Sequence, residues 1–413
     1  MRILYIDPGT GSMLFTILIG IIGAAIYSLR MAFVKLRFVI SGGKKVEMNQ
    51  NKIPFVIFSD NKRYWNIFEP ICRELDQRGV NVVYMTASPD DPALSCGLEH
   101  IKGQFIGEGN KAFAKLNFLN AGVVLSTTPG LDVYQWKRSK EVNYYVHIPH
   151  AANDITLYRM FGIDHYDAVL LPGQFHADQI REMEKLRDLP AKELVTVGIP
   201  YMDEMKKRLD QAGPLADHPT TILLAPSWGP EAILTKYGEK IIQPLLDTGF
   251  HVIIRPHPQS FESEKDLMDK LMKKYPESDQ LEWNRDRDNF EVLRRSDLMI
   301  SDFSGVIFDF TLIYDKPVIY TDAKINTDVY DAWWLKSPLW TTEILPKIGH
   351  KLEEENIGSL KELVEECMHD TKYAEGREEA RKEAWANPGE GAVKTADYLI
   401  AKEKEIVSKE EEK

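Results

Sequence analysis

The stretch Leu298-Met-Ile-Ser-Asp-Phe-Ser-Gly-Val-Ile-Phe-Asp-Phe310 joins a short apolar run to a polar loop and then to apolar residues at helical spacing. This order predicts a buried strand, a tight turn and a helix. A helix start offers unpaired backbone N–H groups and a partial positive charge, which together can hold a phosphate. The candidate residues are Ser301, Asp302, Ser304 and Gly305. A serine or aspartate at this place also serves as an ordinary helix cap, so both interpretations stay open.

A second apolar run, 250–254, ends in Arg255-Pro-His-Pro258. The two prolines fix φ on either side of His257 and so restrict the turn that carries the imidazole. The carboxyl ends of strands are where α/β folds place their chemistry, and Arg255 and His257 are donors suited to an anion. A solvated surface turn is the competing interpretation.

A strand predicted at 143–148 leads into a loop with two histidines, His147 and His150. Histidine is suited to taking a proton near neutral pH, so this loop is a candidate for a general base. The alternative is an imidazole hydrogen-bonded inside the core, which suits His147 better than His150. The segment Ser59-Asp-Asn-Lys62, after the first predicted strand, is interpreted as the beginning of a helix rather than as a substrate loop.

Arg255-Pro-His-Pro258, followed by Ser301-Asp-Phe-Ser-Gly-Val-Ile-Phe-Asp-Phe310, resembles the poly(glycerophosphate) glycerophosphotransferase family of teichoic-acid enzymes. The resemblance covers about 54–399. It implies a GT-B architecture, an α/β fold with two Rossmann-like domains that face a cleft. It also implies a base histidine at the end of the predicted 143–148 strand. The usual Trp-His-Gly-Thr-Pro form of that motif is absent here, so His150 is the better match and His147 the alternative.

The resemblance implies transfer of glycerol phosphate, or another polyol phosphate, from a CDP-linked donor such as CDP-glycerol. The acceptor would be a hydroxyl of a cell-wall or lipid-linked glycan, and CMP would be released. The catalytic residues would be His150 and His257. The donor phosphates would be held by Arg255, Ser301, Asp302, Ser304 and Gly305. No metal and no cofactor would be needed.

Two other functions stay open at this point. One is a GT-B nucleotide-sugar glycosyltransferase of cell-surface polysaccharide synthesis, which would use a UDP- or GDP-sugar. The other is a non-catalytic membrane-tethered scaffold that binds nucleotide or polymer without turnover.

Composition and charge narrow the class of protein. The chain has 413 residues, 28% of them charged and 44% hydrophobic, as in an ordinary globular protein. A net charge of −12 argues against a broad nucleic-acid surface. Cys72, Cys96 and Cys367 are scattered and form no CxxC pair, so neither a disulfide framework nor a zinc site is predicted.

The N-terminus holds a membrane-like segment, because residues 11–29 carry no charge and are mostly apolar. At about 1.5 Å per residue this segment is long enough to cross a bilayer core as a helix. Basic residues cluster after it, so the positive-inside rule predicts a single-pass membrane protein with its catalytic part on the cytoplasmic side. A buried or interfacial helix is the alternative.

The predicted organisation has four parts. They are a membrane anchor and basic linker at 1–50, an N-terminal Rossmann-like acceptor domain at 51–212, a C-terminal Rossmann-like CDP-donor domain at 213–385, and a returning helix with a charged tail at 386–413. The tail from Lys402 is expected to fray. The segment 282–288 is interpreted as a polar loop. The aromatic stretch 330–340 is either a lid, an acceptor platform or a cover for an apolar edge, and an oligomer is possible.

Overall fold

Short apolar runs form two parallel β-sheets in the computed structural model, which describes residues 52–412 except 287, 322–324 and 329–330. Residues Ile53–Lys413 make up one unit that contains both sheets. The α/β class with parallel sheets is therefore confirmed.

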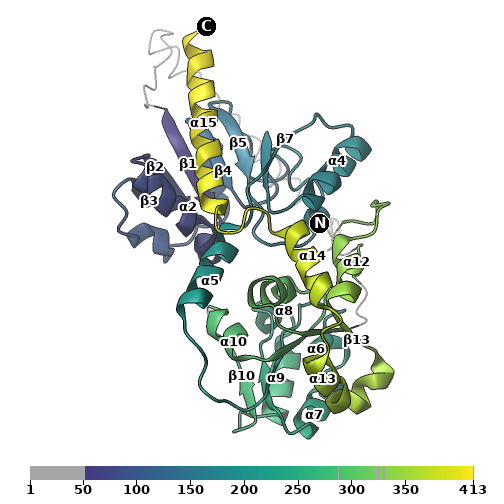
Figure 1. Ribbon diagram of the computed structural model, residues 1–413. Helices are drawn as coiled ribbons and strands as arrows, with labels where there is room; N and C mark the ends of the chain where they lie inside the picture. The colour runs from purple at the N-terminus through teal and green to yellow at the C-terminus, as the bar shows by residue number, and fades with distance from the viewer. Residues whose placement is uncertain (1–51, 287, 322–324, 329–330, 413) are drawn as a thin grey trace, which may run out of the picture. The chain divides into compact units, whose positions relative to one another are not determined.

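The first sheet has the strand order β3-β2-β1-β4-β5-β6-β7 (Figure 1). Its strands are β1 (Ile53–Ser59), β2 (Val82–Thr86), β3 (Ile101–Phe105), β4 (Ala121–Ser126), β5 (Val142–His147), β6 (Ala168–Leu171) and β7 (Glu193–Thr196). Phe55 and Ile57 of β1 lie in one apolar cluster. Val56 and Phe58, which point to the opposite face, lie in another. Both faces of the sheet are covered, as a parallel sheet requires.

Helices connect these strands and cover the sheet. They are α2 (Trp65–Gln77), α3 (Asn110–Leu116), α4 (Phe175–Arg187) and α5 (Pro200–Gln211), with 3-10 turns η1 (Lys62–Tyr64), η2 (Pro92–Ser95) and η3 (Ile155–Leu157). In α2 the residues Ile67, Ile71 and Leu75 recur at helical spacing and all three are buried. This apolar stripe is what packs α2 on the sheet.

The second sheet has the strand order β10-β9-β8-β11-β12-β13. Its strands are β8 (Thr221–Leu224), β9 (His251–Ile254), β10 (Leu281–Trp283), β11 (Leu298–Ser301), β12 (Val318–Thr321) and β13 (Gly349–Leu352). The prediction of a polar loop at 282–288 is wrong at its beginning, because Leu281 and Trp283 are buried in the strand β10.

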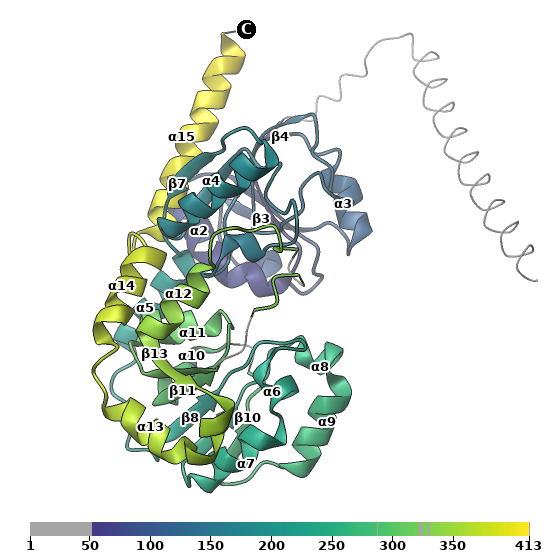
Figure 2. The same cartoon turned by 90° about the vertical axis from the view of Figure 1, so that its right-hand side faces the viewer.

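The connections of the second sheet and the C-terminal segment are also helical. They are α6 (Ile233–Lys236), α7 (Glu239–Asp247), α8 (Ser260–Ser263), α9 (Lys265–Lys274), α10 (Phe290–Arg295), α11 (Val306–Phe308), the π-helix η4 (Asp309–Ile313), α12 (Trp340–Ile348), η5 (Glu354–Ser359), α13 (Leu360–His369), α14 (Ala374–Ala384) and α15 (Gly391–Glu411). Figure 2 shows α14 beside α12, and α15 packs against α2 and β4 of the first sheet.

Both sheets share one topological feature. In each, the strand order runs outward in two directions from a central strand, which is β1 in the first sheet and β8 in the second. The order reverses between β1 and β4 and between β8 and β11. In open α/β sheets, ligands bind at the carboxyl ends of the strands beside such a reversal. These two places are therefore where the loops that carry chemistry are expected.

The chain returns to the first sheet through a tightly packed connection between α14 and α15. Gly198 has φ of +100°, and a Cβ on it would lie 2.2 Å from the carbonyl oxygen of Ala386. Only glycine allows this approach. Asp203, near the beginning of α5, accepts hydrogen bonds from the backbone N–H groups of Gly389 (2.7 Å) and Gly391 (2.9 Å). The returning helix is thus held at its first turn.

The expectation of a frayed tail from Lys402 is wrong, since α15 continues to Glu411. The Lys402 ammonium contacts Glu193 of β7 at 2.7 Å and Glu405 at 2.8 Å. Lys409 pairs with Glu405 one turn earlier at 2.5 Å. Charge pairs along the helix and tethers to the sheet, among them the Asn143 side-chain amide that donates to Glu410 at 2.9 Å, therefore support a segment whose composition alone indicates disorder.

The predicted membrane anchor at 11–29 lies outside the described residues. Among the residues that the structure does describe, no helix is long and apolar enough to span a bilayer.

Candidate active site

Three loops meet at the carboxyl edge of the second sheet, because β9, β8 and β11 are neighbours in it. The loops are 225–229 after β8, 255–259 after β9, and 302–305 after β11. Two of the three were predicted to carry phosphate-binding residues. Parallel strands bring their carboxyl ends to the same edge, so segments far apart in the chain become one surface.

Asp302 ties the loop after β8 to the loop after β11. Its side chain is 1% exposed and accepts hydrogen bonds from the backbone N–H groups of Ser227 (2.9 Å) and Ser304 (3.0 Å). A third N–H, that of Ile233, lies 3.1 Å from the same carboxylate. Burial raises the pKa of Asp302 to about 6, although the three donors favour the ionised form. Asp302 therefore holds the loops in place rather than facing a ligand.

Replacing Asp302 by alanine is expected to lower the free energy of unfolding by about 3 kcal/mol or more, because three buried N–H groups lose their acceptor. Denaturant unfolding of the purified protein measures this change. Asp269→Ala is the control: that carboxylate is exposed and pairs with Lys265 one turn earlier on α9, so its loss should cost less than about 1 kcal/mol. Equal midpoints for the two variants would contradict the assigned role of Asp302.

The serines of the central stretch differ in what they can reach. Ser301 is fully buried, and its hydroxyl donates to the carbonyl of Ala225 at 2.7 Å. The predicted phosphate contact by Ser301 is therefore not supported, because its side chain points into the interior at the end of β11. Ser304 lies one turn later, and among the described residues its hydroxyl has no hydrogen-bond partner. With the adjoining Gly305, Ser304 remains a phosphate-binding candidate.

His257 is held in one tautomer by the turn that carries it. The backbone N–H of Gln259 donates to Nδ1 of His257 at 3.1 Å. Because Nδ1 accepts, the ring proton of the neutral imidazole is on Nε2, which faces away from the turn as a donor. Burial and then the charge of Arg63 lower the pKa of His257 to about 4. Its ring lies 6.3 Å from that of Trp228, which is half-exposed in the neighbouring loop.

The Arg255 side chain is bonded to a neighbouring loop and does not point into open space. Its guanidinium donates to the side chain of Asn284 and, at 2.9 Å, to the carbonyl of Asp286. Both acceptors belong to the loop after β10. Burial lowers the pKa of Arg255, but an arginine stays charged at neutral pH. Arg255 thus braces the turn that carries His257, and the predicted direct phosphate contact gains no support from these hydrogen bonds.

His150 lies at the carboxyl edge of the first sheet, in the loop after β5. Its Nδ1 is 3.3 Å from the hydroxyl of Thr127 and 3.4 Å from the hydroxyl of Tyr158. The ring stacks on Tyr158 with centroids 5.9 Å apart and also faces Tyr64 at 5.1 Å. Burial and the charge of Arg63 lower the pKa of His150 to about 4, so the imidazole is neutral at pH 7. With Nδ1 turned to hydroxyls, Nε2 is the nitrogen left to take a proton.

Arg63 is a residue that the sequence interpretation missed. It belongs to η1, after β1, and its guanidinium donates to the Tyr64 hydroxyl at 2.8 Å. Its charge contributes to the lowered pKa of both His150 and His257, so it lies within electrostatic reach of a histidine from each sheet. Beside it Asp60 accepts a hydrogen bond from the Thr128 hydroxyl at 3.0 Å. The segment 59–62 thus begins a helix, as predicted, and also leads into a part of the site.

His147, the alternative base, is fully buried. Neither ring nitrogen has a hydrogen-bond partner among the described residues. The ring packs against Tyr166 at 5.0 Å and Tyr158 at 5.5 Å. Burial lowers the pKa of His147 to about 3. An imidazole enclosed in this way has no path to an acceptor hydroxyl, which leaves His150 as the accessible histidine of the loop.

Acid is expected to destabilise the fold through His147 and His176, both fully buried. Burial lowers their pKa to about 3 and about 4, whereas a histidine in the unfolded chain keeps a pKa of about 6.5. Between these values only the unfolded chain binds the proton, so this stability is present above pH 6.5 and is lost as the pH falls. Lowering the pH from 7 to 5 should cost about 2 kcal/mol per histidine.

Denaturant unfolding of three proteins at pH 7 and pH 5 checks this expectation. His147→Phe should lose about 2 kcal/mol less than wild type over the interval, since one titrating group is gone. His165→Ala removes an exposed histidine and should follow wild type. An unchanged pH dependence in His147→Phe would contradict the buried neutral state of that ring.

The loop after β5 also contacts the second half of the chain. A Cβ built on Gly305 would lie 3.6 Å from the side-chain amide of Asn153, so the two loops are in van der Waals range. Next in sequence, Asp154 accepts hydrogen bonds from the backbone N–H groups of Trp340 (2.7 Å) and Thr341 (3.0 Å), at the beginning of α12. A carboxylate of one half thus caps a helix of the other.

The aromatic stretch that ends at Trp340 lies against the first half of the chain. The Trp340 ring stacks on Phe175 of α4, with centroids 4.3 Å apart and planes at 10°, and contacts Phe308 of α11 at 4.9 Å. Arg187 of α4 lies over the ring of Trp334 at 4.3 Å. These contacts make the stretch a packed bridge between the halves.

A family model described as CDP-glycerol:poly(glycerophosphate) glycerophosphotransferase matches residues 151–387, more than half of the chain. The match includes His257 and the central stretch and begins directly after His150. No curated protein sequence matches the chain.

Solved structures show the same fold. The wall teichoic acid polymerase TagF is 14% identical with a TM-score of 0.57, over 92% of this chain and 99% of that one. The UDP-GlcNAc 2-epimerase of Methanocaldococcus jannaschii is 13% identical with a TM-score of 0.57, over 84% of this chain and 100% of that one. The corresponding epimerase of Neisseria meningitidis is 14% identical with a TM-score of 0.52, over 84% and 99%. At these identities the similarity shows the GT-B-like fold alone.

The match to the family model identifies the chain, and two parallel sheets with histidine-bearing loops at their carboxyl edges agree with it. The chain belongs to the CDP-glycerol:poly(glycerophosphate) glycerophosphotransferase family and is an enzyme of that type.

Proposed function

We propose that the protein transfers glycerol phosphate, or a related polyol phosphate, from a CDP-linked donor to a hydroxyl of a cell-wall or lipid-linked glycan, with release of CMP. The observation that carries the proposal is the pair of neutral imidazoles, His150 and His257, at the carboxyl edges of the two sheets. Both rings lie within electrostatic reach of Arg63. One is arranged to accept a proton and the other to donate a hydrogen bond.

On the acceptor side, His150 is the general base. Its Nε2 takes the proton of the acceptor hydroxyl while that oxygen attacks the β-phosphorus of the donor. The Thr127 hydroxyl, 3.3 Å from Nδ1, fixes the ring orientation and accepts a hydrogen bond from Nδ1–H as positive charge develops on the ring. The negative charge of a diphosphate bound near Arg63 stabilises the protonated imidazole. The pKa of His150 is therefore raised towards 7 in the complex.

On the donor side, the bond between the β-phosphorus and the bridging oxygen of CMP breaks, and negative charge gathers on the leaving phosphate. The Nε2–H of His257 and the Ser304 hydroxyl donate to the phosphate oxygens, with the backbone after Ser304 and the charge of Arg63 in support. Asp302 and Arg255 keep these groups in position through the loops. In this proposal these donors suffice, and the reaction needs no metal or cofactor.

We further propose that the first sheet, within 51–212, serves the acceptor and that the second, within 213–385, serves the CDP donor. Residues 1–50 would anchor the protein as a single-pass membrane protein with the catalytic part on the cytoplasmic side. This arrangement suits a soluble nucleotide donor and a lipid-linked acceptor.

Incubation of the purified protein with a panel of CDP-, UDP- and GDP-linked compounds tests the proposal. Release of CMP from CDP-glycerol or CDP-ribitol, stimulated by a lipid-linked glycan, is the expected result. Release of UDP or GDP from a nucleotide sugar would point to a glycosyltransferase. No release from any donor, with binding retained, would point to a scaffold.

A further inference from the structure

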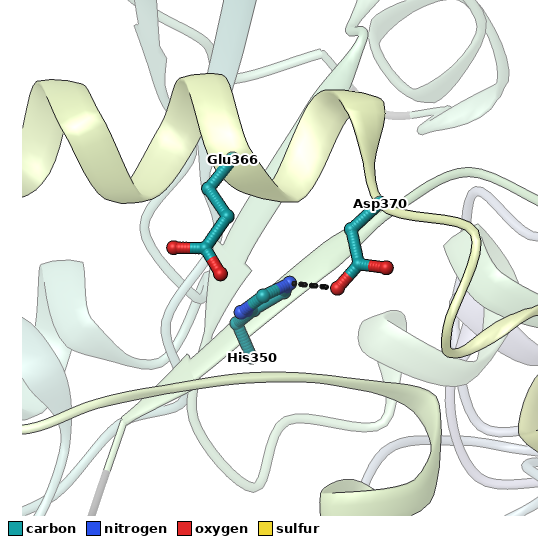
Figure 3. Close-up of side chains that lie close together, drawn as sticks. All are labelled: His350, Glu366 and Asp370. Atoms are coloured by element: carbon teal, nitrogen blue, oxygen red, sulfur yellow. Dashed lines mark ion pairs between the residues drawn. The ribbon is translucent and has the colours of Figure 1, made fainter.

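A histidine and two carboxylates converge at the edge of the second sheet, on residues that the proposed reaction does not use. His350 belongs to β13, Glu366 to α13, and Asp370 directly follows α13. One imidazole nitrogen and one oxygen from each carboxylate lie within 4.8 Å of one another. Figure 3 shows both carboxylates directed towards the imidazole ring, from one helix above one strand.

The imidazole itself indicates that the cluster needs a ligand. His350 is 7% exposed, and its buried Nε2 has no hydrogen-bond partner among the described residues. The nearest carboxylate oxygen, Oδ2 of Asp370, is only 3.1 Å away. This contact has the separation of a hydrogen bond without its angles, so the nitrogen is close to the carboxylate but is not paired by it. A buried imidazole nitrogen left in this state is costly.

The spacing of the ligand atoms suits a small divalent ion. Tetrahedral zinc binds imidazole nitrogen and carboxylate oxygen at about 2.0–2.2 Å, which places ligand atoms about 3.3–3.6 Å apart. The measured 3.1 Å between His350 and Asp370 is close to this separation, and the third atom lies within 4.8 Å. Small movements of the exposed Glu366 side chain on α13 would complete the geometry.

The surroundings support a ligand role for Asp370. The backbone N–H of Lys372 donates to Oδ1 of Asp370 at 2.7 Å, so the other oxygen, Oδ2, is turned towards His350. On the other side, the Tyr373 ring packs edge-on against the imidazole, with centroids 4.8 Å apart. Partners of this kind orient metal ligands in known sites.

We propose that His350, Glu366 and Asp370 bind one Zn²⁺ ion, with water in the fourth position. The site has a structural role, because β13 ends the sheet and the ion would tie this edge strand to α13. His350 is the second residue of β13, whereas the active-site loops follow the carboxyl ends of β8, β9 and β11. The ion therefore lies away from the transferred phosphate and is distinct from the proposed chemistry.

Zinc titration of chelator-treated protein, produced without a polyhistidine tag, tests the proposal. Calorimetry is expected to give one Zn²⁺ per chain, and at about 100-fold excess over Kd the thermal midpoint should rise by about 3 °C or more. Mg²⁺ at the same concentration should leave the midpoint unchanged, since that ion prefers six oxygen ligands. Co²⁺ in place of zinc should show the visible absorption of a four-coordinate site.

Variants separate this cluster from adventitious binding. His350→Ala and Glu366→Gln are each expected to weaken zinc binding by about 10-fold or more. His218→Ala is the matched control, because that histidine faces a single carboxylate, Asp297, at 3.8 Å, and it should bind zinc as wild type does. Glu366→Gln changes an exposed side chain and keeps the test decisive should His350→Ala fail to fold.

Three results would overturn the proposal: no zinc uptake by wild type, equal uptake by wild type and Glu366→Gln, or an equal response to Mg²⁺. CMP release is expected to continue at the wild-type rate in Glu366→Gln. Loss of zinc binding therefore does not depend on whether the proposed transferase activity is correct.

Discussion

Replacing His150 by alanine is expected to lower the rate of CMP release from CDP-glycerol by about 10²- to 10⁴-fold, the usual contribution of a general base. The reason is that Nε2 of this ring is the accessible proton acceptor beside Thr127 and Tyr158. Steady-state release of CMP with saturating donor and acceptor measures the effect. The loss should lie mainly in kcat, because the ring acts on the acceptor proton in the transition state.

Two comparisons sharpen this prediction. His147→Phe places an apolar ring in the buried position and should retain most of the activity, so an equal loss in both variants would argue against His150 as the base.

The pH dependence of the activity supplies the second comparison. The imidazole must be neutral, and its pKa in the free protein is lowered to about 4. Activity at low donor concentration should therefore persist from pH 7 down to about pH 5 and fall at lower pH.

Replacing His257 by alanine is expected to lower kcat by about 10²- to 10³-fold, the effect of removing one preorganised donor from developing negative charge. Gln259 holds Nδ1 as an acceptor, so the donating group is the Nε2–H of the neutral ring. His257→Gln provides an amide N–H at a similar distance and should recover part of the activity. The measurement is again CMP release, with donor binding followed separately by calorimetry.

His251→Ala is the matched control for His257, because both histidines belong to β9 or its loop. His251 begins the strand at the amino end, whereas His257 follows the carboxyl end. The control variant should keep near wild-type activity. Should His257→Ala release CMP at the control's rate, the assignment of the donor site to the 255–259 loop would be wrong.

Much of this architecture follows from local patterns in the sequence. Apolar runs alternate with helical periodicity, which predicts parallel sheets, and the carboxyl ends of 251–254 and 298–301 could be recognised as places for polar loops. The two prolines around His257 indicate more than an ordinary surface turn, and the resemblance implies His150 as the base at the end of the predicted 143–148 strand. The resemblance to the family predicts the GT-B architecture of the two sheets together.

Other features depend on which strands are neighbours in the sheet, and no single segment of sequence shows this. Arg63 joins the site because β1 lies beside β4, so the helix after β1 comes near both histidines. Ser301 and Ser304 are alike in sequence, but the first still belongs to a strand buried on both faces. The strand β10 has only two buried apolar residues, Leu281 and Trp283, which is too few for a periodic signal.

Asp154 has a consequence for how a bulky substrate can enter. Its buried carboxylate accepts two N–H groups and the Thr341 hydroxyl from the other half of the chain. Pulling these apart would leave the buried carboxylate with only the Gln179 side chain as a donor, which costs several kcal/mol. A widening between the two sheets that keeps these hydrogen bonds would leave this point closed. A bulky acceptor of the proposed reaction would therefore have to enter away from Asp154.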